Sequence, residues 1–207
     1  MSGPIVLSLF DLTGNMVKPW AAAGYECVTV DLQAEPGAHR VAPNITQVGG
    51  DVLSWLPPRA EYRIVFAFPP CTDLAVSGAR WFKDKGLAGL AGAIELFERA
   101  RQIAEWADAP WMIENPVSTI SSYWRKPDHA FHPADYTAFE LGDNYTKKTC
   151  LWTGNGFVMP EPARHPDAGE PDNRIHACPP GPDRGNIRSA TPMGFARAAF
   201  EANEASS

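Results

Sequence analysis

Short apolar runs alternate along the chain with longer stretches in which apolar residues recur at helical spacing. Each short run is apolar throughout, which is typical of a strand buried on both faces of a parallel sheet. The predicted strands cover residues 4–10, 26–32, 63–68 and 109–116, with a further one over 147–154.

The helical stretches lie between and after these runs. A short helix is predicted over 16–25 and a long one over 86–107, where apolar side chains fall on one face. Residues 191–205 predict a closing helix with Thr191 as its cap and Pro192 in its first turn. Alternating strands and helices predict an α/β, Rossmann-like fold with a mostly parallel sheet and helices on both faces.

Length and composition fit one domain over residues 1–207. The chain has 207 residues, 44% of them hydrophobic, which is enough to form a single core. Residues 155–187 are rich in Pro, Gly, Asp and Arg and predict a loop-rich segment. We expect no independent domain there, because a loop of this length cannot bury a core of its own.

The overall charge and the cysteines exclude several classes of protein. The net charge of -6 argues against a general nucleic-acid coat protein, although a local basic site is compatible with it. The sequence contains no apolar run of membrane-spanning length and no recognisable signal peptide, so we expect a cytoplasmic protein. The four cysteines are scattered without a CxxC pair, which predicts neither a zinc or other metal site nor a disulfide framework.

Four predicted strands end on residues that can carry chemistry. In a parallel sheet these carboxyl ends meet at one edge, where ligands bind. The residues at these ends are Phe10 and Asp11, then Asp31, then Pro70 and Cys71, and finally Glu114 and Asn115.

The first strand ends predict a nucleoside cofactor without phosphates. Gly14 in the turn after the first strand allows close approach of a ligand, but no GxGxxG cradle for a pyrophosphate is present. Asp31 stands where such folds bind ribose hydroxyls, and Asp51 can accept a hydrogen bond from an adenine amino group. S-adenosylmethionine fits this pattern. The alternative is that both carboxylates are solvated turn residues.

Cys71 and Glu114 are the candidate catalytic groups. Pro69 and Pro70 stop a core strand and present Cys71 at the sheet edge, where a helix start or the basic residues Arg80, Lys83 and Lys85 would favour its thiolate. Glu114 ends an apolar strand, where desolvation would raise its pKa and keep it protonated. The alternatives are an inert buried thiol and an acid that reaches solvent.

A thiolate and a protonated acid beside a methyl donor favour methylation of carbon 5 of a pyrimidine. Addition of the thiolate to carbon 6 makes carbon 5 nucleophilic, and the acid stabilises the adduct at N3. The residues therefore predict covalent catalysis joined to acid catalysis.

The sequence resembles the DNA cytosine-5 methyltransferases, especially the short forms that phages and prophages encode. The stretches "VLSLFDLTG", "FAFPPCTDLAVSGAR", "MIENP" and "RSATPMGFARAAFEAN" carry the likeness, which spans residues 5–203, and "YTKKTCLW" stands where the family has a basic motif. The resemblance implies a class I methyltransferase fold and S-adenosylmethionine as cofactor. It also implies that the last of the four stretches folds back beside the cofactor turn.

The resemblance also implies roles for individual residues. The implied catalytic residues are Cys71, Glu114 and Lys148. The implied cofactor-binding residues are Phe10, Asp11, Gly14, Asp31, Leu32, Asp51, Val52, Pro69 and Ala190. The implied substrate-binding residues are Pro70, Asn115, Arg80 and Lys147.

Three departures from the family pattern leave the substrate open. The first motif has Asp11 to Gly14 where the family is glycine-rich, the basic motif lacks arginines, and residues 155–187 stand in place of a target-recognition domain. Extracting a base from duplex DNA costs free energy. Without a target-recognition domain, the protein has few contacts with DNA to offset that cost. The substrate is therefore duplex or single-stranded DNA, with or without a protein partner for target recognition, or alternatively RNA or a free pyrimidine nucleotide. A module that binds but has lost catalysis is the third hypothesis.

Overall fold

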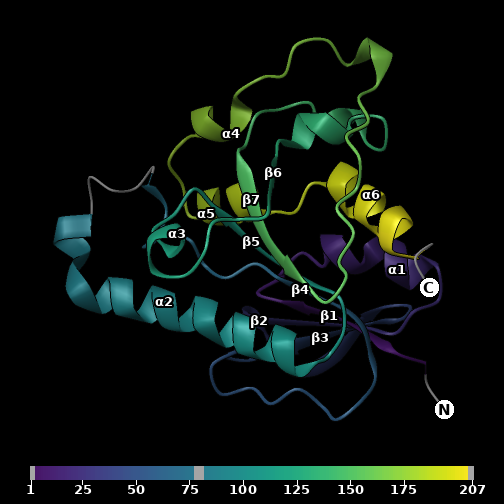
Figure 1. Ribbon diagram of the computed structural model, residues 1–207, viewed down its shortest axis with the longest axis vertical. Helices are drawn as coiled ribbons and strands as arrows, with labels where there is room; N and C mark the ends of the chain where they lie inside the picture. Colours follow the sequence, from purple (N-terminus) through teal and green to yellow (C-terminus); the bar gives the residue numbers. More distant parts are fainter. Residues whose placement is uncertain (1–2, 77–81, 205–207) are drawn as a thin grey trace.

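A seven-stranded sheet forms the centre of the protein (Figure 1). The computed structural model describes residues 3–76 and 82–204. The strands are β1 (Ile5–Leu9), β2 (Cys27–Ala42), β3 (Ile45–Gly49), β4 (Tyr62–Ala67), β5 (Trp111–Pro116), β6 (His129–Phe131) and β7 (Thr149–Gly154). The helices are α1 (Lys18–Ala22), α2 (Phe82–Trp106), α3 (Ile120–Tyr123), α4 (Arg174–Ala177), α5 (Arg184–Ser189) and α6 (Met193–Glu204).

The strand order in the sheet is β3-β2-β1-β4-β5-β7-β6. β1 pairs in parallel with β2 and β4, and β4 pairs in parallel with β5. β7 is antiparallel to both of its neighbours, β5 and β6. The predicted mostly parallel sheet is confirmed, and one reversed strand, β7, is inserted near its edge.

Helices cover both faces of the sheet, as predicted. Because side chains alternate along each strand, β1 sends Leu7 and Leu9 toward α2 and Val6 toward α1 and α6. Figure 1 shows α2 on one side of the sheet and α1 with α6 on the other. Trp20 of α1 is fully buried on the α6 side, and its ring meets Phe200 edge-on with centroids 5.0 Å apart.

Several boundaries differ from the predictions. β2 continues past Asp31 and turns back at residues 36–37, so that residues 38–42 run against β3 in the opposite sense from residues 27–31. β3 and β6 were not predicted, because they are short and partly polar. The long helix begins at Phe82 rather than at residue 86, and it is broken at Gly86, whose φ of 66° and ψ of -170° are not helical.

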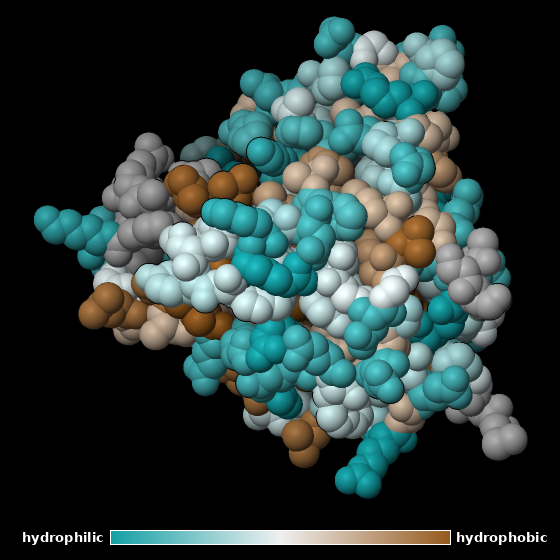
Figure 2. Space-filling view, viewed as in Figure 1, coloured by the Kyte–Doolittle hydropathy of each residue, from teal (hydrophilic) through white to brown (hydrophobic). Residues whose placement is uncertain are grey.

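The segment 155–187 contains only short helical turns, as its composition predicts. Large exposed apolar side chains are spread over many elements, and on the face in Figure 2 they form small separate patches among polar atoms. Among the described helices, none combines the length and apolar character needed to cross a bilayer.

Candidate active site

The turn after β1 is organised by the carboxylate of Asp11. This carboxylate accepts hydrogen bonds from Ser8 Oγ (2.8 Å), Thr13 Oγ1 (3.1 Å) and the backbone N–H of Gly14 (2.8 Å). Burial raises the pKa of Asp11, while these hydrogen bonds oppose the rise. Asp11 is only 4% exposed, so it shapes the turn from inside.

Phe10 and Gly14 both have left-handed backbone conformations in this turn. The φ angles are 56° for Phe10 and 62° for Gly14. Glycine adopts such a φ without strain, but phenylalanine does so at a cost that often marks a functional site. The expectation of a tight turn at Gly14 is confirmed, and the carboxylate of Asp11 holds that turn where the family has glycines.

Asp31 is the last residue of the parallel half of β2 and lies close enough to Asp11 for their charges to interact. Its Oδ1 accepts a hydrogen bond from the backbone N–H of Gln33 at 2.8 Å. Burial raises the pKa of Asp31, which is 8% exposed. The neighbouring side chain of Leu32 is 72% exposed at the same edge. A carboxylate held in this way can accept hydrogen bonds from a diol.

Asp51 and Val52 lie beyond the end of β3, and their side chains differ in environment. Asp51 is half-buried, and its Oδ1 accepts a hydrogen bond from the N–H of Leu53 at 3.0 Å. Val52 is 1% exposed and packs in the core against the α2 side of the sheet. Of this pair only Asp51 presents a polar side chain, so the prediction that the side chain of Val52 binds the cofactor is not supported by its position.

The segment before α6 lies against the edge of the sheet where Asp11 and Asp31 stand. Asn15 Nδ2 donates a hydrogen bond to the carbonyl of Thr191 at 3.0 Å. Asn186 Nδ2 on α5 donates to Gln33 Oε1 at 3.2 Å, and the half-buried Ala190 connects these two contacts. The expectation that this segment folds back beside the first turn is confirmed.

These residues fit a nucleoside cofactor. Carboxylates stand at two neighbouring strand ends, where they can accept hydrogen bonds from hydroxyl and amino groups. The turn from Asp11 to Asn15 carries no basic side chain that would bind a phosphate. The hydrogen-bonding groups at this edge therefore match S-adenosylmethionine better than a dinucleotide.

The loop after β4 carries Cys71 to the next part of the same edge. Pro69 is buried and Pro70 is exposed, while Cys71 is half-buried. The carbonyl of Cys71 accepts hydrogen bonds from the N–H groups of Leu74 (3.0 Å) and Ala75 (2.8 Å), so a tight turn starts at this residue. The two prolines thus end the strand, and the turn fixes the backbone that bears the thiol.

The charges of three side chains act on the Cys71 thiol. Burial is the largest effect and raises its pKa, and the charge of Glu114 raises it further, whereas Lys147 and Arg188 lower it. The expectation of a lowered pKa is therefore wrong for the free protein, because burial outweighs the two cations. Arg80 lies outside the described residues, and Lys83 is exposed.

Glu114 extends from β5 into the same region. Burial raises its pKa and Lys147 opposes that rise. Its Oε1 is buried and has no hydrogen-bond partner among the described residues. An unpartnered buried acid atom is costly unless a ligand completes it. The prediction of a carboxyl group with a raised pKa at this strand end is confirmed.

Asn115 has a different position from the one predicted. Its side chain is fully buried, and Nδ2 donates a hydrogen bond to the carbonyl of Pro69 at 3.1 Å. Because successive residues of a strand point to opposite faces, Asn115 faces the loop that carries Cys71 rather than open space. Asn115 Nδ2 therefore anchors this loop. Its Oδ1 is buried without a hydrogen-bond partner among the described residues, and the role of Asn115 in substrate binding stays a prediction.

The two adjacent lysines before β7 lie in different environments, and Lys147 rather than Lys148 is near Cys71 and Glu114. The charge of Lys147 acts on both Cys71 and Glu114, and Lys147 lines a cleft together with Glu114. Lys148 is exposed, and its charge acts on Cys150 instead. The prediction that Lys148 is the catalytic lysine is therefore not supported, because neighbouring side chains in extended backbone point in opposite directions.

A cleft opens beside Glu114 and Lys147. It is lined by aromatic and small polar side chains from β4, β6, β7 and the segment before α6. The lining residues are Phe68, Glu114, Phe131, Lys147, Thr149, Ser189, Thr191, Pro192 and Phe195. The walls of this small cleft therefore combine apolar rings with one acid and one cation. No group of His, Cys, Asp and Glu in the described part of the chain is arranged to hold a metal ion.

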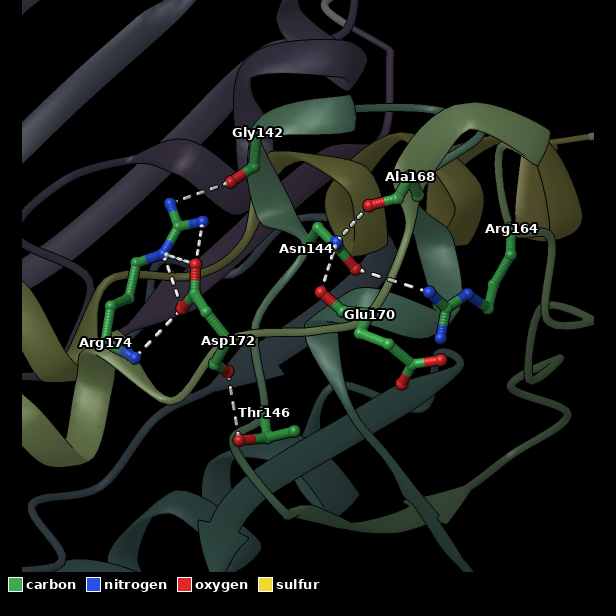
Figure 3. Close-up of polar contacts among 8 residues, drawn as sticks. All are labelled: Gly142, Asn144, Thr146, Arg164, Ala168, Glu170, Asp172 and Arg174. Atoms are coloured by element: carbon green, nitrogen blue, oxygen red, sulfur yellow. Dashed lines mark hydrogen bonds and ion pairs between the residues drawn. The ribbon is translucent and has the colours of Figure 1, made fainter.

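The segment 155–187 is fastened to the body of the protein near β6 and β7 (Figure 3). Asn144 donates hydrogen bonds to the carbonyls of Ala168 and Glu170, and Asp172 accepts from Arg174 in an ion pair of 2.5 Å. Arg174 also reaches the carbonyl of Gly142 at 3.2 Å. These contacts hold the segment against residues 142–146.

Sequence reasoning missed Arg188 and the aromatic wall of the cleft. Arg188 lies on α5, between the loop-rich segment and the last motif, where no predicted element drew attention to it. Phe131 and Phe195 stack with centroids 4.2 Å apart, although they are far apart in sequence. The only available signal was the arginine at the start of "RSATP".

Comparison with known proteins found only distantly similar structures. No protein-family model matches the chain, and no curated protein matches it. Similar solved structures include the CcbJ methyltransferase from Streptomyces caelestis (17% identity, TM-score 0.31, covering 55% of this chain and 43% of that one). The glycopeptide N-methyltransferase MtfA is a second (14% identity, TM-score 0.32, covering 73% of this chain and 65% of that one).

This chain spans less than two thirds of the length of either protein, and similarity at these values carries no argument about reaction or substrate. The class of fold follows from the sheet itself. A seven-stranded sheet ordered 3-2-1-4-5-7-6, with only the seventh strand reversed among its neighbours, is the class I methyltransferase fold. The usual cofactor of that fold is S-adenosylmethionine.

Proposed function

We propose that the protein is an S-adenosylmethionine-dependent methyltransferase that methylates carbon 5 of cytosine in DNA through a covalent bond to Cys71. One observation carries the proposal: Cys71, on the loop after β4, lies close enough to Glu114 of β5 for the charge of that acid to act on the thiol, and Glu114 lines a cleft. A thiol and a buried acid in this arrangement suit addition to carbon 6 of a pyrimidine. The resemblance of four sequence stretches to DNA cytosine-5 methyltransferases supports the same reaction.

The cofactor, when bound, supplies an electrophilic methyl group. Asp31 and Asp51 would hold its ribose and adenine, and the turn from Phe10 to Gly14 would approach it closely. Asn15 and Thr191 join the two segments that border this site.

Cys71 and Glu114 have separate roles in the reaction of the base. Cys71 in its thiolate form bonds to carbon 6, and the electron pair displaced from the C5–C6 bond makes carbon 5 nucleophilic. Glu114 in its protonated form donates to N3, where negative charge would otherwise accumulate. After carbon 5 is methylated, its proton passes to a water molecule, and the electron pair of the C5–H bond restores the C5–C6 double bond. The C6–S bond then breaks with its electron pair on sulfur, which restores the thiolate, and the N3 proton returns to Glu114.

Labelled cofactor and a panel of substrates test the proposal. The purified protein is incubated with tritiated S-adenosylmethionine and with duplex DNA, single-stranded DNA, RNA or dCMP. We expect tritium in 5-methylcytosine from DNA and none with Cys71→Ser. Binding of cofactor and DNA without transfer would instead identify a binding module.

A trap tests the covalent step separately. DNA containing 5-fluorocytosine cannot lose its carbon-5 substituent as a proton, so the protein–DNA bond persists. We expect a covalent complex of one protein and one oligonucleotide by intact mass in the presence of cofactor. Methylation of DNA without any trapped complex would reject the role of Cys71.

A free pyrimidine nucleotide is the second candidate substrate. The loop-rich segment is held on the body of the protein by Asn144 and Asp172, and the net charge is -6. Duplex binding normally depends on neutralising phosphates, which an acidic protein does poorly. Transfer to dCMP at a rate above that to any DNA would favour this candidate, and a partner protein that restores transfer to duplex DNA would favour the first.

A further inference from the structure

Three polar side chains form a row at the turn after β1. Ser8 of β1 lies opposite Thr29 of β2, which in turn lies opposite Gln47 of β3. Two residues earlier on each strand, the corresponding row is apolar and belongs to the core on the side of α1 and α6. That row consists of Val6, Cys27 and Ile45. Because side chains alternate between the faces of a strand, the polar row lies on the same side, where the core ends and the turn begins.

Two members of this row hold the turn. Ser8 provides one of the hydrogen bonds to Asp11. Gln47 Nε2 donates a hydrogen bond to the carbonyl oxygen of Leu12 at 2.9 Å. Thr29 lies between them, but its hydroxyl is fully buried and has no hydrogen-bond partner among the described residues. Within the row, the contact with Leu12 therefore depends on Gln47.

The backbone of Gln47 is held on both sides. β3 lies between the two halves of β2, and Gln47 is opposite Thr29 on one side and opposite His39 on the other. The turn that its side chain contacts contains Phe10, whose left-handed conformation is unfavourable and persists only where the surroundings impose it. A half-buried side chain on a strand paired at both edges is suited to hold such a turn in one position.

The direction of the Leu12 carbonyl decides the direction of a neighbouring donor. The carbonyl of Leu12 and the N–H of Thr13 belong to one peptide unit, and the described chain contains no cis peptide bond. In a trans peptide these two groups point in opposite directions. With the carbonyl directed to Gln47, the N–H of Thr13 points away from the polar row. Thr13 is exposed, and no described residue accepts a hydrogen bond from its N–H.

S-adenosylmethionine carries one group that the acids of this edge cannot bind. Asp31 and Asp51 accept hydrogen bonds when ionised, which suits hydroxyl and amino groups. The carboxylate of the methionine part is also an acceptor and needs donors. No basic side chain is present from Asp11 to Asn15. An unpaired backbone N–H such as that of Thr13 is a donor of the required kind, and its hydrogen bond to a carboxylate is charge-assisted.

We propose that Gln47 is a positioning residue of the cofactor site, which holds the Leu12 carbonyl so that the N–H of Thr13 is presented to the carboxylate of the cofactor. The proposal rests on S-adenosylmethionine as cofactor and is independent of the base that is methylated. Gln47 acts through one peptide unit and does not touch the cofactor itself. None of the sequence stretches that carry the family resemblance includes Gln47.

Calorimetry with two ligands tests this role without any transfer reaction. S-adenosylhomocysteine carries the amino-acid carboxylate, whereas methylthioadenosine has the same adenosine and sulfur without it. We expect Gln47→Ala to bind S-adenosylhomocysteine about tenfold more weakly than the wild type, because a charge-assisted hydrogen bond is weakened. Its affinity for methylthioadenosine should be unchanged. The control Gln102→Ala removes an exposed glutamine of α2 and should change neither affinity.

The amide resonance of Thr13 provides a direct second readout by nuclear magnetic resonance. In the wild type, S-adenosylhomocysteine should shift this resonance downfield, and methylthioadenosine should not. Because this measurement uses the wild type, it decides the role of Thr13 even if Gln47→Ala is unstable. Once a substrate is identified, Gln47→Ala should raise KM for the cofactor and leave kcat nearly unchanged.

Four results would overturn the assignment. Equal affinity of Gln47→Ala and the wild type for S-adenosylhomocysteine would show that the turn keeps its position without Gln47. An equal loss for both ligands would make Gln47 a support of the whole edge. An unshifted Thr13 amide would show that the carboxylate binds elsewhere. If the wild type binds neither ligand, the cofactor is wrong and this role fails with it, whereas absence of transfer to every base would overturn the proposed function alone.

Discussion

Asn115 Nδ2 lies 3.1 Å from the carbonyl oxygen of Pro69 and donates a hydrogen bond to it, fully buried from solvent. Through this bond, the strand that bears Glu114 holds the loop that bears Cys71. The acid and the thiol are therefore positioned relative to each other by one amide, although 43 residues of sequence separate them. This arrangement gives a structural reason for the asparagine that directly follows Glu114.

Replacement of Asn115 should uncouple the two groups. In Asn115→Ala the loop loses its anchor, and a displacement of the thiol by about 1 Å is expected to lower kcat by about 10²-fold. Cofactor affinity should be unaffected, because the cofactor residues lie on other strands. Asn173→Ala, at an exposed position, is the control. Unchanged kcat in Asn115→Ala would show that the loop keeps its position without this bond.

Removal of the thiol should separate catalysis from binding. Cys71→Ser and Cys71→Ala are expected to fold and to bind the cofactor normally, because the thiol carries none of the fold's hydrogen bonds named above. Neither should transfer methyl groups at a detectable rate. Transfer assays and calorimetry on the same samples check both statements, and normal turnover of Cys71→Ala would reject covalent catalysis.

The pKa of Glu114 makes a prediction about stability. Burial raises this pKa above its ordinary value of 4.5, so the ionised acid is less favourable in the folded than in the unfolded protein. The stability associated with protonated Glu114 is complete below pH 4.5 and is lost as pH rises through the raised value. Glu114→Gln should therefore have the higher Tm at neutral and alkaline pH, with the difference shrinking toward pH 4.5.

The same substitution should impair transfer. The amide cannot deliver the proton that N3 requires, and loss of a general acid typically lowers the rate by about 10² to 10⁴-fold. A variant that is more stable at neutral pH but less active would agree with a functional acid. Equal Tm for both proteins across the pH range would show that the burial of Glu114 does not affect its ionisation.

The two adjacent lysines form a natural pair of variants. Lys147→Ala removes a charge that favours the Cys71 thiolate, so the pH profile of turnover should move to higher pH and the rate near neutral pH should fall by about tenfold. Lys148→Ala should leave the profile unchanged, because Lys148 is exposed and acts on Cys150. The opposite pattern would restore the assignment made from the sequence.

Asp11 should be required for the cofactor turn. Asp11→Ala leaves Ser8 Oγ, Thr13 Oγ1 and Gly14 N–H without their common acceptor. Loss of these contacts should cost about 1–3 kcal/mol of stability, measured by urea unfolding, and weaken cofactor binding. Thr13→Ala removes an exposed hydroxyl that donates to Asp11 and accepts from the N–H of Asn15, and because water can replace these contacts it should cost much less. Equal effects of the two substitutions would show that the carboxylate does not organise the turn.

The sequence predicted the features that depend on continuous apolar runs and on residues at strand ends. The sheet, the two covering layers and the meeting of Cys71 with Glu114 follow from that logic. The pattern could not distinguish Lys147 from Lys148, because the direction of a side chain depends on the register of β7 with β5. Nor could it place Arg188, whose position depends on contacts between α5 and residues more than a hundred positions away.

The hydrogen bond from Asn15 to Thr191 has a consequence for synthesis of the chain on the ribosome. The residues on one border of the cofactor site, near Asn15, are synthesised early, whereas those on the other border, near Thr191, are synthesised just before the last helix. A nascent polypeptide that stops before Thr191 therefore has an open pocket. Such a fragment can fold much of its sheet but cannot retain a methyl donor. Premature termination or proteolytic removal of this region should therefore yield inert fragments rather than unregulated enzymes.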